Sequence, residues 1–148
     1  MHRYNTFCLA LFLFLGITSS AVCVAESPND ILIIANKKVK IDTITPEELK
    51  QVFLKKKTSW SNGDRIICIN PTSSSAVRKV FREKVLDMSE SEEKTYWEKQ
   101  KVRRQLTMPA EMRSIVKAVF KLSNAISYAY RKDVPNNVVK VLYVISAQ

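Results

Sequence analysis

Short apolar runs alternate with longer helical patterns along most of the chain. The run Ile31–Ala35 is almost wholly apolar, and residues 65–70 (RIICIN) form a second run of the same kind. Continuous apolar runs of this length are typical of strands that are covered on both faces. Two more apolar stretches, Ile126–Tyr130 and Val138–Ile145, lie near the C-terminus. The pattern therefore predicts four strands.

Helix-start signals separate these strands. Thr45 is a predicted N-cap, followed by a proline in the first turn and by Glu48, which completes a capping box. Ser89 opens a second capping box, another helix is expected after a polar loop, and a last one is expected from Pro109. The apolar residues of the four predicted helices recur at helical spacing: Leu49, Val52 and Phe53; Val77, Val80, Phe81, Val85 and Leu86; Tyr96, Trp97, Val102 and Leu106; Met112, Ile115, Val116, Val119 and Phe120.

The order of the predicted elements is strand, helix, strand, three helices and two strands. Right-handed crossovers between strands in this order predict an α/β fold, with a small, mainly parallel sheet and helices on both faces. The 148 residues are enough for one domain and too few for two of ordinary size. We expect residues 26–148 to form this single domain.

Residues 1–25 have the layout of a secretory signal peptide. A positively charged start precedes the apolar run 7–17 (FCLALFLFLGI), which is short for a membrane span, and small residues follow it. Cleavage is expected before Glu26, and residues 19–21 form a second candidate cleavage site. Lipid attachment at Cys23 and a retained membrane anchor are the alternatives. The protein is therefore expected to be periplasmic or secreted.

Few residues suited to catalysis remain once the signal peptide is removed. The only histidine, His2, and two of the three cysteines lie in it, which leaves Cys68 alone. Ser-His-Asp and Cys-His nucleophiles, an internal disulfide and a histidine or multi-cysteine zinc site are therefore excluded. With two glycines in the whole chain, glycine-rich phosphate loops are excluded as well. We expect no enzyme activity, metal or cofactor, and we expect Cys68 to be buried and inert.

The chain is strongly basic, with a net charge of +10 that falls to +9 without the signal peptide. Attraction to anionic surfaces at low salt follows from this charge whatever the function is. The basic runs 55–57 and 103–104 are far apart and are not interleaved with aromatic residues. They favour a solvated surface over specific nucleic-acid binding. The acidic pairs 47–48 and 92–93 each lie in the first turn of a predicted helix, where they complement the helix dipole.

The polar segment PTSSS, which follows the second predicted strand, is the strongest candidate for a binding site. It lies at the carboxyl end of that strand, where open α/β sheets place ligands. The next helix supplies N–H groups, and the hydroxyls of Thr72, Ser74 and Ser75 supply further donors to an oxyanion. Arg78 is the nearest positive side chain, and Asn36 is expected at the same edge of a parallel sheet. A plain serine cap beside a polar loop is the alternative.

Four motifs occur in an order that resembles a known family. They are IIAN, ending at Asn36; Val52-Phe53-Leu54 followed by Trp60-x-x-Gly63; Ser75-x-x-Arg78-x-x-Phe81 with Val85-Leu86 behind it; and Trp97, Pro109 and residues 124–128 (NAISY). From Ile31 to Val144 the chain resembles the type II periplasmic binding protein family. It is similar in particular to the phosphate-binding components of ABC transporters and their short single-lobe relatives. Of that family's phosphate loop, the serine is matched here by Ser75.

The resemblance implies a single lobe of a periplasmic-binding-protein-like fold. It also implies an exported solute-binding-like protein, associated with phosphate or another small oxyanion in ABC-type uptake. One lobe cannot close over a ligand, so we expect weak binding and a partner: a second lobe, a membrane transporter or another envelope protein. Two alternatives remain. One is an envelope interaction module that keeps the fold without binding a small ligand, and the other is a secreted basic protein that binds anionic polymers such as lipopolysaccharide or nucleic acid.

Overall fold

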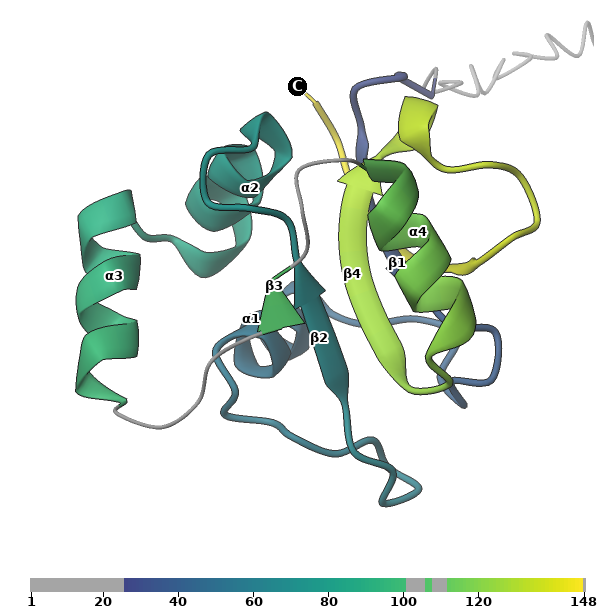
Figure 1. Ribbon diagram of the computed structural model, residues 1–148, viewed down its shortest axis with the longest axis horizontal. Coiled ribbons are helices and arrows are strands. Elements are labelled where there is room, and N and C mark those ends of the chain that lie inside the picture. Colours follow the sequence, from purple (N-terminus) through teal and green to yellow (C-terminus); the bar gives the residue numbers. More distant parts are fainter. Residues whose placement is uncertain (1–25, 101–105, 108–111, 148) are drawn as a thin grey trace, which may run out of the picture.

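The computed structural model describes residues 26–100, 106–107 and 112–147. The predicted signal peptide lies outside the described residues. The elements are β1 (Ile31–Ala35), α1 (Pro46–Phe53), β2 (Ile67–Asn70), α2 (Ala76–Phe81), the π-helical turn η1 (Arg82–Leu86), α3 (Glu90–Lys99), β3 (Leu106–Thr107), α4 (Met112–Lys121), β4 (Ala125–Tyr130), the 3-10 turn η2 (Arg131–Asp133) and β5 (Lys140–Ile145) (Figure 1). No helix in the described ranges is long and apolar enough to cross a membrane.

The strands form one mixed sheet in the order β3-β2-β4-β1-β5. β2 pairs in parallel with β3 and β4, whereas β1 pairs antiparallel with both β4 and β5. The prediction of a mainly parallel sheet is therefore wrong. A strand that is buried on both faces reads as a continuous apolar run whichever way it points. The run ILIIA of β1 therefore could not reveal that it lies antiparallel between the last two strands of the chain.

Helices cover both faces of the sheet, as predicted. Ile31 and Ile33 of β1 pack into one core with residues of α1, α2 and η1, and Leu32 and Ile34 pack into a second core with residues of α4. Figure 1 shows α4 lying along β4 and β1. Every residue of β1 is at most 4% exposed. β1 thus contributes buried side chains to the core on each face of the sheet.

Two predicted helix starts are confirmed by their capping bonds. The Thr45 hydroxyl accepts a hydrogen bond from the Glu48 N–H at the start of α1. At the start of α3, the Ser89 hydroxyl accepts from the Glu92 N–H, and the Glu92 carboxylate accepts from the Ser89 N–H. These bonds fix where the helices begin because they satisfy N–H groups that a first turn leaves without a partner.

The third predicted helix is shorter than its apolar pattern suggested. α3 ends at Lys99, and Leu106, predicted at the end of this helix, belongs instead to β3, where it pairs with Ile69 of β2. Val102 lies outside the described residues. The helical spacing of apolar residues continues by chance beyond the end of α3. It could not exclude a strand, because apolar residues also occur in edge strands.

Phe120 also departs from its predicted place. It was expected on the buried side of α4, but it is 59% exposed. Val116 and Val119 already make the contact of α4 with the sheet, and Ile115 is fully buried as well. The apolar side of α4 is therefore wider near its last turn than the part of the sheet that the helix covers, and Phe120 lies outside that contact.

Candidate anion-binding site

The loop between β2 and α2 brings three predicted site residues together. The Ser75 hydroxyl donates a hydrogen bond to the Thr72 carbonyl at 2.9 Å, and the hydroxyl oxygens of Thr72 and Ser74 lie 3.5 Å apart. Ser74 is exposed, and Thr72 and Ser75 are half-buried. The loop follows Asn70, the last residue of β2. A cluster of hydroxyls therefore lies at the carboxyl end of a strand that has parallel neighbours.

Ser75 opens α2 without capping it through its side chain. Its backbone is extended, as is usual for the residue before a helix, but its hydroxyl makes no bond to the first turn. The hydroxyls of Thr45 and Ser89 do make such a bond in α1 and α3. The Ser75 hydroxyl is turned back into its own loop instead. Ser75 is therefore the N-cap residue of α2 by its backbone conformation, but its hydroxyl does not accept a hydrogen bond from the first N–H groups of the helix.

Arg78 is present beside the loop, but it already holds a carboxylate. It is 8% exposed, and its Nη1 donates to the Pro71 carbonyl at 3.5 Å. Its Nη2 donates to the carboxylate of Glu93 on α3. The positive charge predicted near the loop is thus buried and paired with an acidic residue of another helix.

Asn36 lies at the opposite edge of the sheet, so its predicted place beside the loop is wrong. Because β1 is antiparallel to β4 and β4 is parallel to β2, the end of β1 lies beside the beginning of both strands. There the Asn36 side chain donates to the carbonyls of Val119 and Phe120 at 2.9 and 2.7 Å. These are carbonyls of the last turn of α4, which have no partner within the helix. Asn36 therefore caps α4.

Two charged residues surround Arg78: Arg82, which was not predicted as a site residue, and Glu93, which was expected only to complement a helix dipole. Arg82 and Glu93 are 4% and 5% exposed. The Arg82 Nη1 lies 3.7 Å from the Glu93 Oε2, and the Arg82 Nη2 lies 3.7 Å from the Glu90 Oε2. The side chain of Glu90 is 72% exposed, whereas that of Glu93 is 7% exposed. Two buried guanidinium groups therefore share one buried carboxylate.

A signal for this cluster is present in the sequence. Arg78 and Arg82 are four residues apart, so they lie on one side of their helix. Glu93 is three residues before Tyr96, so it shares a face with an aromatic residue. Opposite charges on the inward faces of two consecutive helices indicate a buried ion pair. The signal was hidden because an acidic residue in a first turn is equally explained by the helix dipole.

A buried amide lies next to the loop. Asn70 is 2% exposed, and its Oδ1 accepts a hydrogen bond from the Tyr128 hydroxyl at 3.1 Å. Within the described part of the chain, the Nδ2 of Asn70 and the Nε and Nη1 of Arg82 have no hydrogen-bond partner. Burial raises the pKa of Tyr128 well above its usual value, because desolvation disfavours the phenolate, so Tyr128 remains a neutral donor. Hydrogen-bond donors therefore outnumber acceptors at this end of β2.

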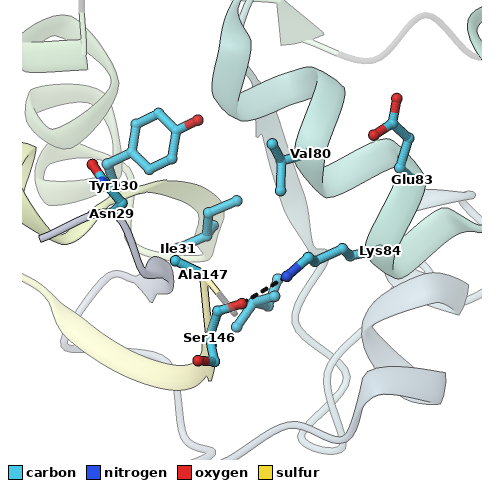
Figure 2. Close-up of a pocket in the computed structure, with 9 residues that line it drawn as sticks. Asn29, Ile31, Val80, Glu83, Lys84, Tyr130, Ser146 and Ala147 are labelled. Carbon is cyan, nitrogen blue, oxygen red and sulfur yellow. Dashed lines mark hydrogen bonds between the residues drawn. The ribbon is translucent and has the colours of Figure 1, made fainter. Parts of the chain in front are cut away.

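A hollow of about 350 Å³ lies at the same end of the sheet, because Tyr130 at the end of β4 lines it (Figure 2). Figure 2 shows Tyr130 on one side of the hollow and Val80 of α2 on the other. The Lys84 Nζ donates to the Ser146 carbonyl at 2.8 Å, and the acidic Glu83 is also part of the lining. This hollow is a poorer anion site than the loop with Asn70, because Lys84 is already bonded and Glu83 would repel an anion.

Cys68 in β2 is buried, as predicted. Its Sγ donates to the Val52 carbonyl at 3.4 Å. Burial raises the pKa of the thiol to about 11, because the thiolate would lose its hydration. At neutral pH the side chain is therefore a protonated thiol of low reactivity.

Solved phosphate-binding proteins share this fold, whereas no protein-family profile and no curated protein sequence matches the chain. One is a Clostridium perfringens protein described as a phosphate ABC transporter substrate-binding protein and solved with bound phosphate (TM-score 0.62, 18% identity). The others include an ABC-type phosphate transport receptor from Vibrio cholerae (TM-score 0.61, 16% identity) and PstS from Borrelia burgdorferi (TM-score 0.59, 16% identity).

The alignments cover most of this chain and about half of each solved structure. They span 78%, 79% and 78% of the chain, but 45%, 47% and 50% of the Clostridium, Vibrio and Borrelia proteins. At these identities the likeness concerns the fold alone. The resemblance found in the sequence is confirmed at this level: the chain has the fold of one lobe of a phosphate ABC transporter substrate-binding protein.

Proposed function

We propose that this chain is an exported solute-binding-like protein that binds phosphate or another small oxyanion, in association with ABC-type uptake. The observation that carries the proposal is the polar loop from Thr72 to Ser75, which lies at the carboxyl end of β2 in a lobe that folds like phosphate-binding proteins. Open α/β sheets place their ligands at such strand ends.

The donors and charges around the loop support an oxyanion as the ligand. The loop offers hydroxyls, α2 begins without a side-chain cap, and the buried Nδ2 of Asn70 has no partner among the described residues. Phosphate and related ions accept several hydrogen bonds from N–H and O–H groups at once. Buried positive charge close by favours an anion over a neutral solute.

We expect binding to be weak in the isolated protein. A single lobe leaves one side of the ion in water, so the dissociation constant is expected to be about millimolar. A second lobe from another protein, a membrane transporter or another envelope protein that covers the loop would tighten it. The proposal includes a periplasmic or extracellular location, with residues 26–148 as the mature chain.

Thermal unfolding of the purified protein tests the proposal. Phosphate at tens of millimolar should raise the Tm above the value measured in chloride at matched ionic strength. Ser75→Leu should abolish this difference, because it removes a hydroxyl and crowds the start of α2. The control is Ser123→Leu, at an exposed serine just before β4 and thus at the opposite edge, which should keep the full response. Equal Tm values in phosphate and chloride for the parent protein would overturn the proposal.

The edge strand β5 favours a second candidate function, an envelope interaction module that keeps the fold without a small ligand. Among the described strands, β5 pairs only with β1, and its residues Val141, Tyr143 and Val144 are 41%, 36% and 40% exposed. An edge strand with exposed apolar side chains is suited to contact with another protein. This candidate predicts that neither phosphate nor sulfate shifts the Tm relative to chloride.

A further inference from the structure

We infer that Glu93 occupies, from within the chain, an oxyanion site formed by Arg78, Arg82 and Asn70, and that an external oxyanion binds there by displacing Glu93 and releasing α3. The inference rests on the proposed function and deepens it, because it names the groups that supply the positive charge and the element that controls access to them.

The way α3 is attached to the rest of the molecule is the first observation. Helices usually dock through an apolar stripe. In α3 the buried residue is Glu93, and its other side chains are half-buried or exposed. The Tyr96 hydroxyl adds a bond to the Leu54 carbonyl at 2.8 Å. Figure 1 shows α3 at the periphery, away from the sheet. A carboxylate between two guanidinium groups therefore supplements the apolar contact that Tyr96 makes with the core.

The balance of buried charge is the second observation. Among the described residues, Arg78 and Arg82 bring two buried positive charges, and Glu93 brings one buried negative charge. Glu90 also lies near Arg82, but its exposed carboxylate is largely screened by water. An uncompensated charge in a protein interior is costly. A second negative charge at this place would therefore stabilise the fold.

The unused donors are the third observation. The Arg82 Nε and Nη1 and the Asn70 Nδ2 are buried, and none has a hydrogen-bond partner in the described ranges. A carboxylate offers two oxygens in one plane, and the Glu93 Oε2 stays 3.7 Å from Arg82. A tetrahedral dianion such as hydrogen phosphate carries more acceptor oxygens and more charge. It therefore matches the two guanidinium groups and the amide better than Glu93 does.

Glu93 and an external anion compete because both need the same guanidinium groups. The apparent affinity for the anion is then reduced by the fraction of molecules in which α3 is released. Removal of the Glu93 charge removes the competitor and leaves the arginines in place. Anion binding should become tighter, although the protein without anion becomes less stable.

The first test compares phosphate binding by the parent protein, Glu93→Gln and Glu90→Gln, through the phosphate dependence of the Tm at matched ionic strength. We expect the apparent dissociation constant for phosphate to fall at least about tenfold in Glu93→Gln. Glu90→Gln is the matched control on the same helix and should bind like the parent. An unchanged or weaker phosphate response in a folded Glu93→Gln protein would overturn the inference.

The second test uses the parent protein alone, so it decides the matter even if Glu93→Gln fails to fold. Amide hydrogen exchange is measured with phosphate and with chloride at matched ionic strength. Phosphate should speed exchange in α3 and leave α4 unchanged or slower. A phosphate-dependent Tm with unchanged exchange in α3 would leave the proposed function standing and overturn the inference. Phosphate binding by Glu93→Gln but not by the parent would support the inference and overturn the proposed function of the parent protein.

Discussion

The two ten-residue helices α3 and α4 are attached to the molecule in opposite ways. α4 packs Val116 and Val119 into a core with β1, β2 and β4, and Ile115 is fully buried beside them. α3 buries a carboxylate between two arginines, and among the described residues Tyr96 is its half-buried contact with the hydrophobic core. Neighbouring segments of one small domain are thus held by different physical forces.

This difference predicts that α4 keeps its position when the solvent changes, whereas the position of α3 can change. No anion competes for an apolar contact, and phosphate or sulfate strengthens such burial slightly, so α4 should stay in place whichever of these anions is present. Contact through charged groups depends on pH and on competing ions. The docking of α3 should therefore respond to conditions that leave α4 unaffected.

The largest expected effect comes from a cavity under α4. Ile115→Ala removes a fully buried side chain and should lower the free energy of unfolding by about 2–5 kcal/mol. Urea denaturation measures this loss. The difference between the Tm in phosphate and the Tm in chloride should remain that of the parent protein. A loss below about 1 kcal/mol would contradict apolar anchoring of α4.

A smaller effect is expected where α3 touches α1. Tyr96→Phe removes the bond from the Tyr96 hydroxyl to the Leu54 carbonyl and should cost about 1 kcal/mol. Amide exchange in α3 should become faster while exchange in α4 does not change. Tyr143→Phe, at a tyrosine that is 36% exposed on β5, is the control and should alter neither. Equal acceleration in α3 and α4 would show that the two helices open together.

Mild acid should destabilise α3 at a higher pH than α4. The N–H and hydroxyl of Ser89 lower the pKa of Glu92 below its usual 4.5. A lowered carboxyl pKa contributes stability that is complete above the unfolded value and is lost as the pH falls through the folded one. The protection of the α3 amides, measured against their intrinsic exchange rates at each pH, should therefore fall below about pH 4.5 before that of α4, whose first turn has no acidic residue among the described residues. Glu92→Gln should remove this pH dependence, and identical acid profiles for the two helices would contradict it.

The smallest expected effect belongs to the outer ion pair of Arg82. Glu90→Gln removes a carboxylate that is 72% exposed, and the free energy of unfolding should change by less than about 0.5 kcal/mol. Chemical denaturation at low and at moderate salt measures it. A loss well above this value would mean that Glu90 balances the charge of Arg82, and the excess of buried positive charge would disappear.

Local chemistry made part of the fold predictable. Thr45 and Ser89 satisfy N–H groups within three residues, so the sequence shows where α1 and α3 begin. The direction of β1 depends on pairing with strands near the other end of the chain, and an apolar run carries no information about direction. The parallel sheet was predicted for this reason, and Asn36 was placed at the wrong edge as a consequence.

The candidate site was predictable to a similar extent. Thr72, Ser74 and Ser75 are consecutive or nearly so, and one turn brings their hydroxyls together. The partnership of Arg78 with Glu93 joins residues of different helices, and its signal in the sequence is weak because an acidic residue in a first turn is equally explained by the helix dipole. Long-range ion pairs of this kind need the packing of two helices to be known.

The place of β1 between β4 and β5 affects how the chain reaches its folded state. Ile31, in the first described strand, pairs with Tyr130 on one side and with Ile145 on the other, so both partners lie far away in the sequence. Contacts between distant parts of the sequence form slowly because a long loop must close first. β1 therefore cannot complete its pairing until β4 and β5 have both been synthesised, and deletion of β5 would leave the apolar strand β1 with an open edge that is prone to aggregation.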